Sequence, residues 1–422
     1  MAAPTLNSVQ LESSVAACLL LLAGFAIPWG PVERLLESRA RILSSLRRLA
    51  RRRNWAILLV GMVAFAGDAL VSQWKPPYPS ARDEFSYLLA ADTFAAGRLT
   101  NPTPAQWQHF ETPEVLVRPT YQSKYPPGQG LILAIGQGLT GNPLAGVWLS
   151  SALACAALCW MLQAWVGDTW ALYGGLLAAF QLSFFGRWAQ SYWGGMVAAL
   201  GGALLYGALR RIADEENTRS RLLPSLLLAG GLLILANTRP FEGLLVAIPA
   251  LLVLIGTLLR RPNLRKHFYR QVAVPMSAVL LFGAALMLTY NRAVTGHAGQ
   301  LPYQAYERQY DAVPSFIFQP LRPWPQLQDA AMQAAAVDTL AASRWAHGFY
   351  RWAFVSSKFL QYWQFAFGAA LSLPFVLLVW AERWPAWVRI SQLIAFLVVQ
   401  ALAAESFLFW PSPRPAWIVL LL

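Results

Sequence analysis

The sequence predicts an all-α polytopic membrane protein, a bundle of helices that crosses a bilayer several times. The chain has 422 residues, of which 57% are hydrophobic and only 13% are charged, and its mean hydropathy is +0.42. Soluble domains carry about 25% charged residues, so this composition excludes an ordinary globular domain. The hydrophobic residues also form long runs, as a bilayer core of about 30 Å requires.

Several apolar runs are long enough, or nearly long enough, to span a membrane. They cover residues 14–30, 55–74, 143–166, 169–186, 194–209, 222–236, 243–259, 272–290, 359–380 and 390–410. The runs 194–209 and 222–236 are short against a requirement of about 17–25 residues, so we expect them to borrow flanking residues. No positive charge precedes 14–30, which argues against a signal peptide, and we interpret this run as an extra span.

The distribution of positive charge predicts which ends of the spans lie in the cytoplasm. Five arginines between Arg47 and Arg53 precede the run 55–74, and the positive-inside rule places that end in the cytoplasm. With this orientation the inside loops hold 19 of the 33 Lys and Arg residues. The net charge of +13 is therefore better explained by topology and anionic lipids than by nucleic-acid binding.

The spans divide the chain into a short N-terminal part and a main domain. Residues 1–54 form an extra span and a basic cytoplasmic segment, and residues 55–422 form the main transmembrane domain. Two long outer loops, 75–142 and 291–358, interrupt the main domain, and loops of this length are typically functional. The last residues, 417–422, resemble the beginning of another span, so we expect the natural protein to be longer.

The first outer loop contains two predicted helices. One has Ser80 as its N-cap and Gly97 just beyond its end, and its first turn carries Asp83 and Glu84, where the helix dipole favours negative charge. The other, 128–139, is too short to cross the bilayer, and we expect it to lie along the outer surface. In the second outer loop the Pro-rich stretch 311–325 predicts an extended segment.

Acidic residues are the first candidates for chemistry. A carboxylate above the outer membrane surface can accept a proton from a substrate whose apolar tail stays in lipid, although Asp83 could also be a plain helix-start acid. Glu84 points to a different side of the helix, and we expect it to orient an acceptor or to bind a backbone amide. Asp68 and Glu405 lie within spans, where they either face a cavity or satisfy polar neighbours.

Three groups of residues carry a resemblance to a known family. The Asp-Glu pair is followed, before the next span, by Ser123-Lys124-Tyr125-Pro126-Pro127. The second group consists of two motifs, Ser191-Tyr192-Trp193-Gly194-Gly195 and Asn237-Thr238-Arg239-Pro240-Phe241-Glu242-Gly243. The third group is Tyr290-Asn291-Arg292 with Pro302-Tyr303, Tyr306 and Tyr310. Over roughly residues 55 to 410 the chain resembles the GT-C membrane glycosyltransferases, in particular the branch of protein O-mannosyltransferases (family 39) and aminoarabinose transferases.

The resemblance implies a GT-C architecture and a reaction at the periplasmic face of a bacterial inner membrane. A sugar would pass from a polyprenyl-phosphate donor to an acceptor hydroxyl of a lipid, glycan or protein, with inversion and with Asp83 as the general base. Lys124 matches the family's phosphate-contacting lysine. A further candidate for the phosphate is Arg239, and Arg187 and Arg292 are weaker candidates. Candidates for binding the sugar or the acceptor are Tyr192, Trp193, Glu242, Tyr303 and Tyr306.

Simpler interpretations and other functions stay open at this point. Lys124 could anchor its loop at the headgroups, Arg239 could be a snorkelling interfacial arginine, and Tyr192 could belong to an aromatic belt. The chain could be a lipid or sugar transporter or flippase, although transporters usually place polar groups near mid-membrane. It could also be an inactive scaffold that binds polyprenyl lipid. The histidines are isolated and predict no metal site, no cofactor is indicated, and a requirement for a divalent metal is left open.

Overall fold

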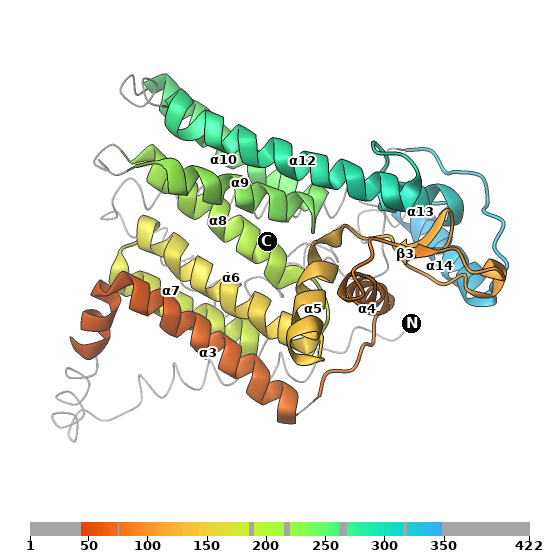
Figure 1. The fold of residues 1–422 in the computed structure, drawn as a ribbon, viewed down its shortest axis with the longest axis horizontal. Helices are drawn as coiled ribbons and strands as arrows, with labels where there is room; N and C mark the ends of the chain where they lie inside the picture. The colour runs from red at the N-terminus through yellow and green to blue at the C-terminus, as the bar shows by residue number, and fades with distance from the viewer. Residues whose placement is uncertain are drawn as a thin grey trace.

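The fold is a helical bundle with a smaller group of helices and strands at one end (Figure 1). The computed structural model describes residues 44–74, 76–184, 190–214, 220–260, 268–314 and 319–347. Three predicted spans, 14–30, 359–380 and 390–410, lie outside the described residues, as do Arg187 and Glu405. Within the described part the chain is mostly helical, which agrees with the predicted class.

The bundle consists of long apolar helices that follow the predicted runs closely. They are α3 (Arg53–Trp74), α6 (Leu144–Trp165), α7 (Asp168–Ala179), α8 (Gly195–Ala213), α9 (Leu222–Ala236), α10 (Pro240–Arg260) and α12 (Val274–Thr295). A π-helical turn, Phe180–Phe184, continues α7, and another, Tyr269–Ala273, precedes α12. As predicted, α8 recruits flanking residues. The run 222–236 does not, because α9 has the same bounds as the apolar run, and that expectation was wrong.

Small residues allow the bundle helices to pack closely. α6 lies between α3 and α8, α9 packs on α8, and α12 packs on α9. At the crossing of α8 and α9, a Cβ atom on Gly231 would lie 2.6 Å from the backbone oxygen of Gly201. Apolar helices in lipid gain little from hydrophobic association with one another, so such close van der Waals packing is a main source of their attraction.

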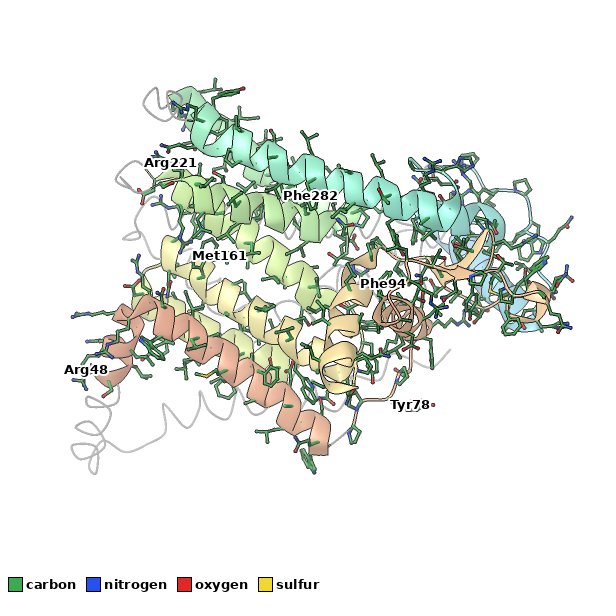
Figure 2. All side chains as sticks on the ribbon, viewed as in Figure 1. Arg48, Tyr78, Phe94, Met161, Arg221 and Phe282 are labelled. Carbon is green, nitrogen blue, oxygen red and sulfur yellow. The ribbon has the colours of Figure 1, made fainter. Side chains whose placement is uncertain are left out.

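Several of these helices have the length and surface of membrane spans. Among the described residues, five helical stretches are long and apolar enough to cross a bilayer: α3, α6, α8, α10 and the continuous stretch Tyr269–Thr295. Large apolar side chains on α10 and α12 are exposed, among them Leu252 at 63% and Phe282 at 67% (Figure 2). A surface of this kind is costly in water and suits the acyl chains of a bilayer. These features are those of a membrane protein.

The group at the end of the bundle is built from the two predicted outer loops. It contains α4 (Arg82–Ala95), α5 (Pro127–Thr140), α13 (Pro302–Tyr310), α14 (Ala330–His347) and the 3₁₀ turn Trp107–His109. The predicted helix 128–139 corresponds to α5. The Pro-rich stretch contains no helix or strand at residues 311–314 and 319–325, the parts of it that the structure describes.

Two details of this group differ from the sequence-based expectation. A small antiparallel sheet joins β1 (Asn101–Pro102), β3 (Thr120–Ser123) and β2 (Val115–Leu116) in that spatial order. Strands of two to four residues leave almost no periodicity in a sequence. The N-cap of α4 is Ala81 rather than Ser80, and the Glu84 side chain accepts hydrogen bonds from the N–H groups of both residues.

Candidate functional site

Buried charged residues gather where α4, α5, α13 and the small sheet meet the bundle. Asp83, Glu84 and Lys124 are all at most 6% exposed, although they lie in the predicted outer loop. Charged side chains are rarely buried unless they are paired or have a functional role. The contacts below describe two adjoining clusters, one around Arg239 and one around Lys124.

Glu84 binds backbone amides with both of its carboxylate oxygens. Oε1 accepts hydrogen bonds from the N–H groups of Ser80, at 3.2 Å, and Ala81, at 3.1 Å, at the start of α4. Oε2 accepts the N–H of Tyr192 at 3.0 Å. This arrangement agrees with the interpretation that Glu84 binds a backbone amide. It also ties the Ser191–Gly195 motif to α4, 108 residues away in the chain.

Asp83 belongs to the cluster around Arg239. Its carboxylate lies within electrostatic range of Tyr87, Tyr125 and Arg239. Burial is the main reason that the pKa of Tyr125 lies well above its ordinary value, and the negative charge of Asp83 adds to the shift. The acid that the sequence proposes as a base therefore has a cation within electrostatic range.

Arg239 lies in the turn between α9 and α10 and is largely buried. Its guanidinium forms an ion pair with Glu242, at 3.7 Å, in the first turn of α10. Burial by itself lowers the pKa of Arg239, but Glu242 and Asp83 are among the neighbours that outweigh it, and the pKa is raised. The guanidinium is therefore held charged inside the protein, within electrostatic range of two carboxylates.

Lys124 follows β3 and is the centre of the second cluster. Its ammonium pairs with the Glu114 carboxylate at 2.5 Å and lies 4.8 Å from the ring centre of Tyr303 and 4.4 Å from that of Tyr306. Burial alone would lower the pKa of Lys124, yet the pKa is raised well above its ordinary value, with Glu114 the first of the opposing influences. Ion pairing and cation–π contacts together stabilise the buried charge.

The two clusters adjoin each other through Tyr125 and Gly128. The ring of Tyr125 stacks on Tyr87 at 4.7 Å, and its hydroxyl donates a hydrogen bond to Glu114 at 2.8 Å. Four residues after Lys124, the N–H of Gly128 donates to the backbone oxygen of Asn237 at 2.7 Å, which connects the start of α5 to the turn that carries Arg239. Segments around residues 83, 124 and 239 thus form one site.

The structure also adds residues that the sequence reasoning missed. Glu114 contacts Lys124 directly, and Asp311 lies within electrostatic range of the same ammonium. Glu307, on α13, forms an ion pair with Arg322 at 2.8 Å. A signal was available for Glu114, because it is an acid only ten residues before Lys124, but nothing in the sequence connects Asp311 or Arg322 with the first loop.

The remaining predicted site residues have varied positions. Tyr192 and Trp193 are buried among core residues, each 8% exposed, and Glu242 is in the Arg239 cluster. Arg292 is exposed in the last turn of α12 and is not part of the contacts around Lys124 or Arg239. Asp68 is fully buried in α3, beside Ser151 and Ser183 of neighbouring helices.

Within the described residues, no group of three or more His, Cys, Asp or Glu side chains is arranged to hold a metal ion. Three carboxylates of the charged site form ion pairs: Glu114 with Lys124, Glu242 with Arg239 and Glu307 with Arg322.

Asp311 leads to a testable dependence of stability on pH. Burial, with Glu114 and Glu307 adding to it and Lys124 and Arg322 opposing it, raises the pKa of Asp311 from 3.8 to about 6. The folded protein therefore binds this proton more tightly than the unfolded chain, and the stability linked to it is full below pH 4 and is lost as the pH rises toward 6. We expect Asp311→Asn to be more stable than the wild type at pH 7.5, by about 3 kcal/mol, and to lose this advantage at pH 4.

Melting temperatures in detergent at the two pH values measure this effect. Asp338→Asn is the matched control, because Asp338 is an exposed aspartate on α14, and its melting temperature should follow that of the wild type at both pH values. An Asp311→Asn variant with the same difference from wild type at pH 4 and pH 7.5 contradicts the raised pKa.

Comparison with known proteins identified no relative of this chain. A scan against models of protein families found no match, and searches of curated proteins and of solved structures found no similar protein.

Proposed function

We propose that this protein transfers a sugar from a polyprenyl-phosphate donor to an acceptor hydroxyl at the outer face of the membrane. In this proposal Asp83 accepts the proton of the hydroxyl, while Lys124 and Arg239 bind the phosphate that leaves the sugar. Glu84 holds the start of α4 in position rather than reacting, since both of its oxygens bind backbone amides.

The observation that carries the proposal is the meeting of one carboxylate and two cations from three distant segments. Asp83 and Arg239 interact electrostatically, and Lys124 adjoins them through Tyr125. An alcohol is a poor nucleophile until a positioned base takes its proton, and a base of this kind contributes about 10²–10⁴-fold to a rate. The phosphate gains negative charge as the bond to the sugar breaks, and buried cations stabilise that charge.

The surroundings of the site suit a lipid-linked donor. The site lies at an end of a bundle whose helices expose apolar side chains, so a polyprenyl tail could remain in the bilayer while its phosphate reaches the cations. Arginines lie at the opposite end, where Arg48 and Arg221 are far from Phe94 and the site (Figure 2). By the positive-inside rule, the arginine end is cytoplasmic and the site faces outward.

The direct test is turnover by the purified protein. We expect the protein in lipid nanodiscs to consume a polyprenyl-phosphate sugar only when an acceptor is present and to release polyprenyl phosphate, measured by mass spectrometry. Envelope glycans and lipids from cells with and without the protein should differ by the sugar that is transferred. Movement of the intact donor across the bilayer with no release of polyprenyl phosphate would support a flippase and contradict the proposal.

A further inference from the structure

We propose that Glu114 is a positioning residue of the donor site: it holds the Lys124 ammonium when no donor is bound and gives it up to the donor phosphate when one enters. This inference rests on the proposed function, because it concerns how the phosphate reaches the cation. Glu114 would then determine how tightly the donor is held.

The backbone of Glu114 is held in an unusual conformation by several elements. Its φ angle is +72°, in the left-handed region that residues other than glycine seldom adopt. Its N–H donates to the hydroxyl of Tyr306 at 3.1 Å, and its carbonyl accepts the hydroxyl of Ser86 at 2.6 Å and the N–H of Lys124 at 3.3 Å. α4, α13 and the segment after β3 therefore all hold one residue in place. Non-glycine residues kept in such conformations cluster at functional sites.

The side chain of Glu114 is already paired with the ammonium that a phosphate would contact. Oε2 lies 2.5 Å from the lysine ammonium and accepts the hydroxyl of Tyr125 at 2.8 Å. Tyr303 and Tyr306 lie on the same ammonium, and Lys124 is only 6% exposed. A phosphate oxygen can make a charge-assisted hydrogen bond to this ammonium only by sharing or replacing the contact with the carboxylate.

The other charges near Lys124 make exchange more favourable than simple addition of the phosphate. Asp311 and Glu114 both interact with Lys124, and Glu307 is already paired with Arg322. An added phosphate would therefore enter a region where the carboxylates already balance or exceed the cations. If the Glu114 carboxylate moves away from the Lys124 ammonium, the phosphate replaces it as the partner of that ammonium. The Tyr125 hydroxyl remains available to hold the displaced carboxylate.

The test compares the binding of farnesyl phosphate by wild-type protein and Glu114→Gln, measured by isothermal titration calorimetry in nanodiscs. Gln keeps the length of the side chain and an oxygen for the Tyr125 hydroxyl, but it has no charge with which to compete for Lys124. We expect the Kd to fall about tenfold, a change of about 1.4 kcal/mol, and the KM for the donor to fall with it. An unchanged or higher Kd in the folded variant overturns the proposal.

Two further variants separate direct competition from a general electrostatic effect. Asp311→Asn removes a nearby charge that is not in the Lys124 ion pair, and it should lower the Kd less than Glu114→Gln does; an equal effect overturns the proposal. In the Lys124→Met background, Glu114→Gln should no longer lower the Kd, and a tenfold gain that persists there also overturns it.

Folding and the proposed function are tested separately. If Glu114→Gln does not fold, Glu114→Asn serves in its place, because asparagine adopts positive φ more readily and is also uncharged. Wild-type turnover with no tightening in the variants would contradict the role of Glu114 and leave the glycosyltransferase proposal intact. If neither the wild-type protein nor any variant binds farnesyl phosphate, this result contradicts the phosphate site on which both proposals depend.

Discussion

Asp83→Asn is expected to lower the rate of sugar transfer by about 10³-fold, while the protein stays folded and inserted in the membrane. Asparagine has nearly the same shape and suits the first turn of a helix, but its amide cannot accept the proton of an acceptor hydroxyl. The loss should appear in kcat, whereas donor binding should change little, because the cations that bind the phosphate remain. Single-turnover measurements with donor and acceptor in nanodiscs distinguish the two effects.

The matched control for this prediction is Asp92→Asn. Asp92 is on the same helix, α4, but it is exposed and accepts a hydrogen bond from Gln137 at 2.8 Å, away from the cations. Its variant should transfer sugar at the wild-type rate. Full activity in Asp83→Asn, with protein of normal melting temperature, would end the assignment of Asp83 as the base.

Gly128→Ala should separate the two halves of the site and lower both stability and turnover. A Cβ atom at Gly128 would lie 2.6 Å from the backbone oxygen of Asn237 and 2.5 Å from the side chain of Thr238, so the start of α5 and the turn before Arg239 must move apart. Overpacking of this kind costs about 1–3 kcal/mol. A displacement of about 1 Å between catalytic groups can cost about 10²-fold in rate.

Gly138→Ala, on the same helix, is the control. A Cβ atom at Gly138 would meet no atom within 4 Å, so the variant should be stabilised by about 0.5–1 kcal/mol through helix propensity alone. The melting temperature should therefore fall in Gly128→Ala and rise in Gly138→Ala. Turnover should fall only in Gly128→Ala. Equal behaviour of the two variants would show that the contact between Gly128 and Asn237 does not hold the site together.

Much of the bundle could be predicted because bilayer thickness imposes a length on apolar runs. The run 222–236 has the same bounds as α9, and the run 143–166 differs from α6 by a residue at each end. The short helix α5 was predicted for the same reason, since twelve apolar residues cannot cross a bilayer. The small sheet was not predicted, because its strands depend on pairing between residues far apart, such as Asn101 with Tyr121.

The sequence indicated some residues of the candidate site but none of the contacts between them. Asp83, Lys124 and Arg239 were selected by residue type, position and resemblance, and the structure places them in adjoining clusters. Arg292 was selected on the same grounds, yet it is exposed outside those clusters. Residue type indicates which chemistry a side chain can perform, whereas its partners depend on how distant segments pack.

The sequence by itself determined that this chain is a helical membrane protein, where the long apolar helices of the described bundle lie, and some of the acids and cations of the candidate site. Those properties follow from local hydrophobicity and charge, which each segment carries with it wherever it folds. Only the tertiary structure decided that Glu84 binds the Tyr192 amide and that Glu114 holds Lys124. These contacts join elements that are separate in the sequence, and their geometry is set by helix packing and by the cost of burying a charge without a partner.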